Sequence, residues 1–366
     1  MGESSKRRRI VIAINSLATG GTQRFISVLT FYLCQQENLE IHMVLFGREP
    51  KIHFDLPENL NIHKPDTVFK NRFRTLYTLG RLIYLRRTIR RIKPSSVLSC
   101  GEYWNNLVLI ALMGLLTPVY VSDRSEPGKR LGMVHNKLRD ILYKKAAGFI
   151  AQTGFAAEYA TKLKWNRNIK VIGNPVNEMK PISRDRRQEK IILSVGRMIA
   201  TKNFDRLVKV FLEIDDKDWK LVIVGGDHGK QKVFGPLKEL VKEHHAEDRV
   251  LLPGYQSNIA EYYERSQIFA FMSSSEGFPN AILEAFAAAL PVVAFQYNPG
   301  IRDLMRDGSN GFLVPLDDDE QFKQKLLLLM KDSKLRQSMA AEAAHTVREF
   351  ELDRIGESLC DFILDK

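Results

Sequence analysis

Cysteine is scarce in this chain of 366 residues, which contains Cys34, Cys100 and Cys360 and no others. Three scattered cysteines form neither a disulfide framework nor a Cys-x-x-Cys metal site, so a reducing compartment such as the cytoplasm is expected. The eight histidines include no His-x-x-x-His helix pair accompanied by a glutamate, which is the pattern of many zinc enzymes. The sequence therefore predicts no bound metal.

The chain also has no apolar run long enough to cross a bilayer. The longest, residues 107–121, is shorter than the roughly 20 residues of a membrane-spanning helix and contains Thr117-Pro118. We expect a buried helix that leads into a strand. Near the basic start of the chain, the apolar run 10–14 is too short for the core of a signal peptide, and no cleavage site follows it. A cytoplasmic protein is expected.

Three common catalytic motifs are missing as well. The loop that contains Gly20-Gly21 lacks the Gly-x-Gly-x-x-Gly pattern of dinucleotide-binding proteins. Residues 225–231 lack both the spacing and the Ser or Thr of a P-loop. No Gly-x-Ser-x-Gly elbow is present. These absences disfavour dehydrogenases, P-loop nucleotidases and α/β-hydrolases.

Positive charge is concentrated in the first half of the chain. The net charge is +12, and residues 1–180 hold 29 Lys and Arg against 13 Asp and Glu, whereas residues 181–366 hold 26 against 30. Such asymmetry points to an anionic partner for the first half, which could be a nucleic acid, a phospholipid surface or a phosphorylated substrate.

Short β-branched runs alternate with helical patterns along the chain, which predicts parallel sheets covered by helices on both faces. The polar, basic segment 177–190 contains Pro181 and has no apolar periodicity, so it is expected to be a linker. We expect an N-terminal α/β domain at 1–176 and a second α/β domain at 191–345. Residues 346–366 are expected to form a helix that packs back on the N-terminal domain. The expected strands are 10–14, 41–46, 97–100, 119–122, 148–152, 191–195, 221–224, 250–252, 268–271 and 291–295.

The strongest local pattern is the segment 273–291, in which Ser-Ser-Ser-Glu-Gly-Phe-Pro is followed by a mostly apolar stretch. Pro279 and Pro291 favour a helix of about three turns between them. Glu284 is the only charged side chain in this helix, and a buried carboxylate needs a partner, so we expect it to face a polar ligand or a buried cation. Glu276, in the preceding loop, could bind the other end of the same ligand. The alternative is a structural ion pair for Glu284 and a solvated Glu276.

Glycines and cations follow other expected strands. Gly196 ends the strand 191–195, so Arg197 and Lys202 should lie at the carboxyl edge of the sheet, where open α/β folds bind ligands and a diphosphate could be held. An exposed basic loop is the alternative interpretation. Gly20-Gly21 opens a helix and Gly225-Gly226 follows a strand, although a Gly-Gly pair alone usually marks a turn.

Residues 69–94 carry nine basic side chains and no acidic one. Their apolar residues fall at helical spacing, which predicts a basic amphipathic helix. We expect the apolar seam to pack on the sheet, with entry into lipid as the less favoured alternative, and the arginines to face anionic lipid head groups. The seam consists of Leu82, Leu85, Ile89 and Ile92, and the arginines are Arg86, Arg87, Arg90 and Arg91.

These motifs and their order resemble those of glycosyltransferase family 4, whose members are retaining enzymes of the GT-B fold. The resemblance extends over nearly the whole chain. The matching motifs are Gly20-Gly21 with Arg24, Gly196-Arg197 with Lys202-Asn203, Gly225-Gly226, the E-x7-E signature from Glu276 to Glu284, and the turn 307–311. The resemblance implies two Rossmann-like, doubly wound α/β domains facing a central cleft. It also implies a UDP-sugar as co-substrate, with no cofactor and no required metal.

The family's site residues carry over by position. Arg197 and Lys202 would bind the diphosphate, Glu284 the ribose hydroxyls, and Glu276 with the Gly277-Phe278 backbone the transferred sugar; Leu252 to Tyr255 occupy the base position. Glu276, Arg197 and Lys202 are thus the expected catalytic residues. The other expected donor-binding residues are Gly20, Gly21, Gly196, Gly225, Leu252, Tyr255, Gly277, Phe278, Pro279, Asn280 and Glu284.

One departure concerns the acceptor side. Relatives often have a histidine near the sugar in the N-terminal domain, where this chain reads Ser-Asp-Arg-Ser-Glu-Pro from 122 to 127. The expected acceptor-binding residues are Glu102, Asp123, Arg124 and Glu126, and Gly101 is expected beside them.

The basic first domain favours a membrane-held acceptor, such as a polyprenyl-diphosphate-linked saccharide, and an anionic membrane surface as partners. The expected protein is a hexosyl- or N-acetylhexosaminyltransferase of bacterial-type glycan or polysaccharide assembly, peripheral on the inner face of the cytoplasmic membrane. Two alternatives remain, a GT-B-fold sugar-nucleotide epimerase and a non-catalytic basic protein that binds membranes or RNA. Nucleic acid is not expected as a partner, because no aromatic stripe accompanies the basic residues.

Overall fold

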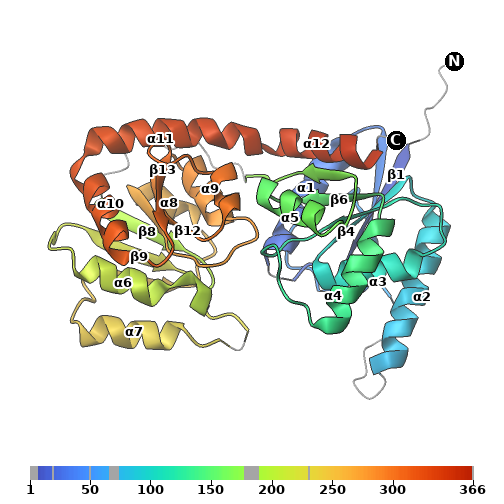
Figure 1. Cartoon of the computed structure of the whole chain (residues 1–366), viewed down its shortest axis with the longest axis horizontal. Helices are drawn as coiled ribbons and strands as arrows, with labels where there is room; N and C mark the ends of the chain where they lie inside the picture. The colour runs from blue at the N-terminus through green and yellow to red at the C-terminus, as the bar shows by residue number, and fades with distance from the viewer. Residues whose placement is uncertain are drawn as a thin grey trace. The chain divides into compact units, whose positions relative to one another are not determined.

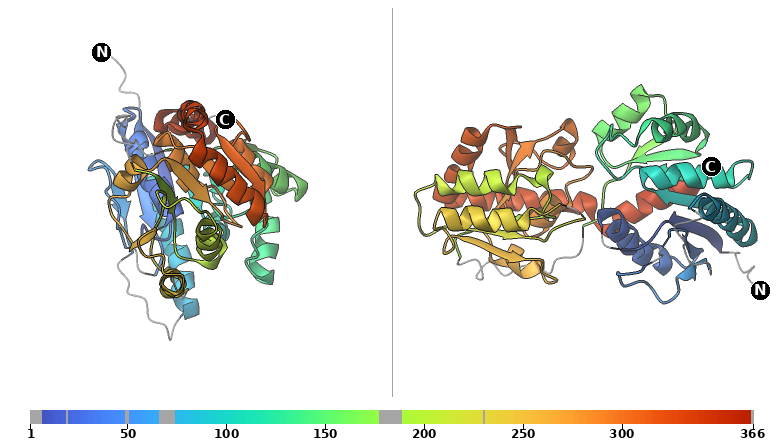
Figure 2. Two further views of the ribbon diagram at one scale, coloured as in Figure 1. Left: turned by 90° about the vertical axis from the view of Figure 1, so that its left-hand side faces the viewer. Right: turned by 90° about the horizontal axis from the view of Figure 1, so that it is seen from below.

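The computed structural model describes residues 7–18, 20–48, 51–65, 74–176, 189–229 and 231–364. The chain divides into two compact units, one formed by residues 1–175 with 350–366 and the other by residues 176–349 (Figure 1). Each unit has a single parallel sheet with helices against it (Figure 2). Most of the expected linker, residues 177–188, lies outside the described residues.

The first unit is built on a seven-stranded sheet in the order β3-β2-β1-β4-β5-β6-β7, with every strand parallel to its neighbours. Strand β1, between β2 and β4, has a fully buried apolar run at residues 10–14, as expected for a strand covered on both faces. Its strands are β1 (Arg8–Ile14), β2 (Leu39–Leu45), β3 (Asn61–His63), β4 (Ser96–Cys100), β5 (Val119–Ser122), β6 (Gly148–Ala151) and β7 (Ile169–Val171). Its helices are α1 (Gly21–Gln35), α2 (Arg74–Ile92), α3 (Glu102–Leu112), α4 (Met133–Leu142), α5 (Gly154–Lys162) and α12 (Leu352–Leu364).

Helix α12, the last element of the chain, belongs to the first unit and lies against α1 (Figure 1, red and blue). The contact is close, because a Cβ on Gly356 would lie 2.2 Å from the Tyr32 ring. Phe362 also packs edge-on against Tyr120 of β5, with ring centroids 5.2 Å apart. The chain therefore leaves the first unit after residue 175 and rejoins it at residue 350.

The second unit has a six-stranded parallel sheet in the order β10-β9-β8-β11-β12-β13. Strand β8 lies between β9 and β11, so the order reverses there and the carboxyl ends of these strands form the usual ligand edge of an open α/β sheet. The strands are β8 (Ile191–Val195), β9 (Lys220–Val224), β10 (Val250–Gly254), β11 (Ile268–Phe271), β12 (Val292–Gln296) and β13 (Gly311–Pro315). The helices are α6 (Phe204–Leu212), α7 (Phe234–Glu243), α8 (Ala260–Arg265), α9 (Asn280–Ala287), α10 (Asp319–Lys331) and α11 (Ser333–Val347).

Helix α9 follows the strongest sequence pattern but is shorter than expected. It has eight residues rather than three turns, and Pro279 is its N-cap residue. It ends early because Ala289 adopts a left-handed conformation with φ 51° and the Leu290 amide donates to the Ala285 carbonyl at 2.9 Å. The expected length was wrong, although the helix lies where the sequence places it.

Two other expectations are confirmed in the helices. The apolar run 107–121 forms the end of α3 and leads into β5. The seam of α2 packs inward, with Leu85, Ile89 and Ile92 in the core of the first unit. The favoured alternative for this helix, packing on the sheet, is the one observed.

Candidate functional site

Glycines bring the ends of β8, β9 and β10 close together at the carboxyl edge of the second sheet. A Cβ on Gly225 would lie 1.8 Å from the Gly196 carbonyl oxygen, so no side chain fits there. The Gly196 amide donates to Val224 O at 3.0 Å and the Gly225 amide to Gly254 O at 3.0 Å. Backbone thus lines this edge, where a ligand can approach closely.

Lys202 ends a short 3₁₀ turn, Ala200–Lys202, and is directed back over this edge. Asn203, in the left-handed region with φ 52°, anchors the turn by donating its side-chain amide to Met272 O at 2.8 Å. Lys202 Nζ lies 2.5 Å from Glu276 Oε1 and 4.9 Å from the centre of the Phe271 ring. The two side chains of this ion pair are 11% and 16% exposed. The structure therefore brings together two of the three residues predicted to be catalytic.

Glu276 is fixed by further contacts. Ser273 Oγ donates to the same carboxylate oxygen, Oε1, at 2.7 Å. The loop itself is tied to the Lys202 turn, because the Ser274 amide donates to Thr201 O at 2.8 Å. Asn298, which follows β12, donates to the Glu276 carbonyl at 3.5 Å. The alternative interpretation of Glu276 as a solvated loop residue is wrong.

Glu284 is buried in α9, with 8% of its surface exposed. Its Oε2 accepts a hydrogen bond from the Tyr263 hydroxyl at 3.0 Å, and the same hydroxyl lies 3.3 Å from Ala281 O. Tyr263, from α8, is fully buried and stacks on Phe269 with centroids 5.7 Å apart. A hydroxyl therefore holds one oxygen of this carboxylate.

The remaining donor-side residues are arranged less uniformly. Arg197 and Tyr255 are exposed. Leu252 instead packs partly buried against the core, and it lines a cavity of about 660 Å³ beside β10 that includes neither Glu276 nor Glu284. Phe278 and Pro279 are buried, and Gly277 and Asn280 are half-buried.

In the first unit, Gly20 is the N-cap residue of α1 and Gly21 its first residue. A glycine cap provides no side chain for the first helical amides, and the first turn of α1 contains no acidic residue. The helix N-terminus is thus suited to an anion.

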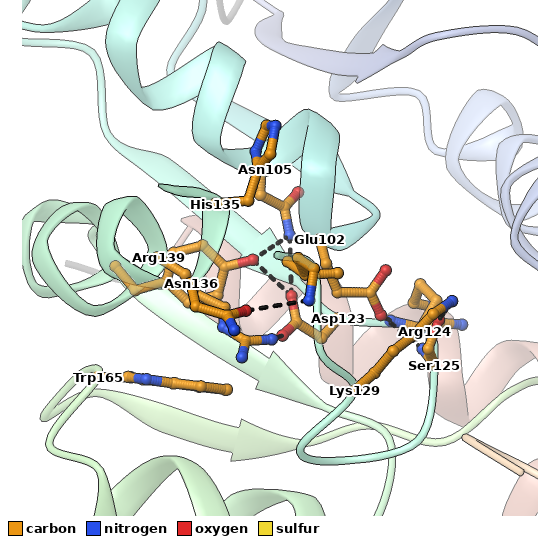
Figure 3. Close-up of polar contacts among 12 residues, drawn as sticks. Glu102, Asn105, Asp123, Arg124, Ser125, Lys129, His135, Asn136, Arg139 and Trp165 are labelled. Carbon is orange, nitrogen blue, oxygen red and sulfur yellow. Dashed lines mark hydrogen bonds and ion pairs between the residues drawn. The ribbon is translucent and has the colours of Figure 1, made fainter. Parts of the chain in front are cut away.

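Three of the four residues predicted to bind acceptor form one network in the first unit (Figure 3). Glu102 opens α3 immediately after β4, and its Oε1 accepts from the backbone amides of Arg124 at 3.0 Å and Ser125 at 2.7 Å. Gly101, with φ 105°, allows this turn from strand to helix. Glu102 therefore fixes the loop that follows β5. Glu126 lies farther along the same loop and is half-buried.

Asp123 is the most strongly perturbed carboxyl of this network. Its Oδ1 accepts from the Tyr143 hydroxyl at 2.5 Å and from Asn105 Nδ2 at 3.2 Å, and Arg139 lies 3.7 Å from Oδ2. Burial, and then the nearby charge of Glu102, raise the pKa of Asp123 to about 7. Figure 3 shows Arg139 between this carboxylate and Trp165, over whose ring the guanidinium lies at 4.2 Å.

Arg124 is a cation whose guanidinium contacts neutral groups, with the charge of Glu102 nearby. Its guanidinium donates to Ser122 Oγ at 3.3 Å and to Asn174 Oδ1, and it lies 3.6 Å from the centre of the Phe25 ring of α1. Burial lowers the pKa of Arg124 to about 10. Within the described residues, Arg124 forms no ion pair and its Nε has no hydrogen-bond partner.

The predicted membrane-facing arginines separate into two groups. Arg87, Arg90 and Arg91 are exposed, as expected. Arg86 is half-buried and donates to Ala111 O at 2.9 Å and Met113 O at 2.8 Å. The expectation that Arg86 faces outward was wrong, because its guanidinium donates hydrogen bonds to carbonyls at the C-terminal end of α3.

Sequence reasoning missed the residues that position the predicted ones. Tyr263, Ser273 and Asn298 hold the two glutamates or their loop, and Asn105, Tyr143 and Arg139 hold Asp123. Ser273 belongs to the quoted motif, but the others come from separate elements and carry no local pattern. Only the fold brings them to the site.

Neither a metal site nor a membrane span is found in the described part of the chain. Its residues include no group of three or more His, Cys, Asp and Glu side chains suited to hold a metal ion. No helix among these residues has the length and apolarity needed to cross a membrane.

Comparison with known proteins identifies the family. The family model for glycosyl transferases group 1 matches residues 176–346. An uncharacterized glycosyltransferase from Haemophilus influenzae is 33% identical, over 94% of this chain and 96% of its own length. The chain belongs to this glycosyltransferase family.

A more distant relative and a solved structure of similar fold extend the comparison. The N-acetylgalactosamine-N,N'-diacetylbacillosaminyl-diphospho-undecaprenol 4-alpha-N-acetylgalactosaminyltransferase of Campylobacter jejuni is 25% identical, over 98% of this chain and all of its own length. The crystal structure of Anabaena HepE in complex with UDP superposes with a TM-score of 0.78 at 16% identity, covering 97% of this chain and 98% of that one. The expected α/β fold of GT-B type, with two Rossmann-like domains, is confirmed for this glycosyltransferase.

Proposed function

We propose that this glycosyltransferase is a retaining, family 4-type enzyme. It transfers a hexose or N-acetylhexosamine from a UDP-sugar to a polyprenyl-diphosphate-linked saccharide in bacterial glycan or polysaccharide assembly. The observation that carries the proposal is the Lys202–Glu276 ion pair at the carboxyl edge of the second sheet, beside the glycine-lined ends of β8 and β9. A buried, pre-positioned cation and carboxylate at a ligand edge are suited to a substrate with a charged end and a hydroxyl-rich end.

On the donor side, Lys202 and the exposed Arg197 would bind the diphosphate. Glu284, held by Tyr263 through one oxygen, would accept from the ribose hydroxyls. Glu276 and the Gly277-Phe278 backbone would bind the transferred sugar, and Tyr255 would lie at the base. The UDP bound by the structurally similar HepE supports this choice of nucleotide.

The proposed reaction needs no protein nucleophile. The acceptor hydroxyl attacks the anomeric carbon on the face that the diphosphate leaves, and the departing phosphate oxygen takes the hydroxyl proton. The anomeric bond to the diphosphate breaks as the new glycosidic bond forms, so UDP and the glycosylated acceptor result. Lys202 and Arg197 stabilise the charge that develops on the leaving group, so the proposal requires no metal ion.

On the acceptor side, the basic first unit supports a phosphate-bearing, membrane-held substrate. Arg124, whose guanidinium forms no direct ion pair with a carboxylate among the described residues, lies at the carboxyl edge of the first sheet and is the residue best suited to an acceptor phosphate. The name of the Campylobacter jejuni relative specifies an undecaprenol-diphosphate acceptor. We place the enzyme at the anionic inner face of the cytoplasmic membrane.

The test is to assay UDP-sugars with and without undecaprenyl-diphosphate saccharides and to follow UDP release and the anomeric configuration of the product. Lys202→Ala should lower kcat by about 10²–10³-fold, the loss typical when one charge-stabilising group is removed. Lys217→Ala, an exposed lysine of the same unit, is the matched control and should change little. A product of inverted configuration would refute the retaining mechanism. If the protein epimerises the UDP-sugar in the absence of acceptor, the epimerase alternative is favoured. If it binds RNA in a salt-sensitive way and turns over no UDP-sugar, a non-catalytic basic binding protein is favoured.

A further inference from the structure

Helix α4 of the first unit exposes large apolar side chains although it is fully folded. Met133 is 74% exposed, Val134 67% and Ile141 58%. These residues and Lys137 lie at positions i, i+1, i+4 and i+8 of the helix, so they share one outward face. The opposite face packs inward through Leu142 and Arg139. We call Met133, Val134, Lys137 and Ile141 the α4 face.

The surroundings of the α4 face are basic. Exposed cations precede the helix at Lys129 and Arg130 and follow it at Lys144 and Lys145. The nearby exposed acid, Asp140, accepts a hydrogen bond from Trp165 Nε1 at 2.8 Å. Apolar side chains ringed by lysines match an anionic lipid surface, because the stems and apolar groups enter the head-group boundary while the ammonium groups meet the phosphates.

The helices near α4 carry further exposed aromatic and apolar side chains. Tyr103 of α3 is partly exposed and packs edge-on against His135 of α4, with ring centroids 4.8 Å apart. Helix α2, on the other side of α3, exposes Leu76, Leu79 and Ile83 (Figure 1). Tyrosine at the rim of an apolar patch is typical of membrane–water interfaces.

We propose that the α4 face is a membrane-docking surface that inserts Met133, Val134 and Ile141 into the head-group region of an anionic bilayer. This inference rests on the proposed function, in which the acceptor is membrane-held. The sequence predicted that the arginines of α2 meet the lipid head groups. The present inference differs, because it assigns membrane contact to apolar side chains of another helix, α4. The charge around the face favours lipid over a second copy of the chain, since two such basic surfaces would repel each other.

Helix α4, which carries the α4 face, makes polar contacts with the proposed acceptor region. Arg139 of α4 reaches Asp123 at 3.7 Å, and Asn136 Oδ1 accepts from the Leu131 amide at 3.1 Å. Asn106 of α3 donates to His135 O at 3.0 Å. Docking through α4 therefore brings the lipid head groups near the loop that Glu102 and Asp123 hold, where a lipid-linked acceptor would enter.

The test measures partitioning of the full chain into vesicles of phosphatidylcholine with and without 30 mol% phosphatidylglycerol, a composition of about one anionic lipid in three, as the proposal requires a charged surface. The triple variant Met133→Ser, Val134→Ser, Ile141→Ser should partition at least about tenfold more weakly. The matched control exchanges three exposed leucines elsewhere, Leu163→Ser, Leu316→Ser and Leu328→Ser, and should bind like the wild type. Replacing Lys137, Lys144 and Lys145 by Gln should remove the preference for anionic vesicles.

Unchanged vesicle binding by the α4 triple variant would overturn the inference, and so would a change in oligomeric state without a change in vesicle binding. Stabilisation of each variant by UDP checks that its second unit is intact, and circular dichroism checks the first. The two proposals fail separately. If the wild type docks through α4 but glycosylates no lipid-linked acceptor, the proposed function fails and the docking surface stands. If it glycosylates such an acceptor and the triple variant still docks, the inference alone fails.

Discussion

At the scale of single residues, the two glutamates of the E-x7-E pattern lie in different environments. Glu276 pairs with the Lys202 ammonium, whereas one oxygen of Glu284 is held by the neutral Tyr263 hydroxyl. The sequence identified both carboxylates because their spacing and apolar context are local properties. It could not identify Tyr263, which lies 21 residues away on another helix and reaches the site only through packing.

Removing the Tyr263 hydroxyl should deprive Glu284 of a hydrogen bond without creating a cavity in the core. Tyr263→Phe keeps the ring that stacks on Phe269, so we expect UDP to bind about 10- to 150-fold more weakly, as one hydrogen bond to a charged group contributes about 1.5–3 kcal/mol. The loss should be smaller for a UDP analogue without ribose hydroxyls. Calorimetric titration of both nucleotides into wild type, Tyr263→Phe and Glu284→Ala provides the measurement. Equal losses for the two nucleotides would show that the hydroxyl does not act through ribose recognition.

Asp123 should make the stability of the protein depend on pH. Burial raises its pKa from 3.8 to about 7, so between these values the folded state keeps a proton that the unfolded state has released. This carboxyl therefore stabilises the fold fully below about pH 4, and its contribution is lost as the pH rises to about 7. The free energy of unfolding of wild type relative to Asp123→Asn should fall from pH 5 to pH 7 and level off above. A difference independent of pH in urea titrations would contradict the raised pKa.

At the scale of elements, the interior strands were predictable, whereas three of the four edge strands were missed. The ten expected strands are all present, and nine of them are interior strands with apolar runs that the sheet buries; the tenth, β10, is a partly exposed edge strand. The strands that were missed, β3, β7 and β13, lie at sheet edges. Two of them, Asn61–His63 and Ile169–Val171, are short and half-exposed, so no continuous apolar pattern marks them. Similarly, the apolar seam of α2 was readable, whereas the contact of Arg86 with α3 depends on how two helices pack.

The close approach of β8 and β9 gives a prediction at this scale. In Gly225→Ala the new Cβ would meet the Gly196 carbonyl at 1.8 Å, so the two strand ends must separate. We expect a loss of about 1–3 kcal/mol in the free energy of unfolding, the range for overpacking, and weaker UDP binding. Gly235→Ala is the control, since no atom lies within 4 Å of its Cβ and α7 should gain up to about 1 kcal/mol. Equal stabilities of the two variants in denaturant titrations would refute the steric argument.

At the scale of the whole molecule, the two units differ in charge and in the sites that they hold. The basic half of the sequence forms most of the first unit, which holds the Glu102–Asp123 network and the α4 face. The second unit holds the Lys202–Glu276 pair and is the part that the family model matches. Sequence order predicted this assignment, because each motif stays within one unit. The last helix was also expected to pack on the first unit, and it lies there against α1, more than 300 residues away along the chain.

The central claim is that the second unit binds a nucleotide diphosphate through Arg197 and Lys202. The most direct measurement is the thermal stability of the wild type with saturating UDP, GDP, ADP or NAD, because a ligand at 100 times its Kd adds about 2.7 kcal/mol to the stability of the folded state. We expect UDP to raise the Tm and this shift to disappear in Arg197→Ala, while the Tm without ligand is unchanged. A Tm that no nucleotide shifts, or a UDP shift that survives in Arg197→Ala, would contradict it.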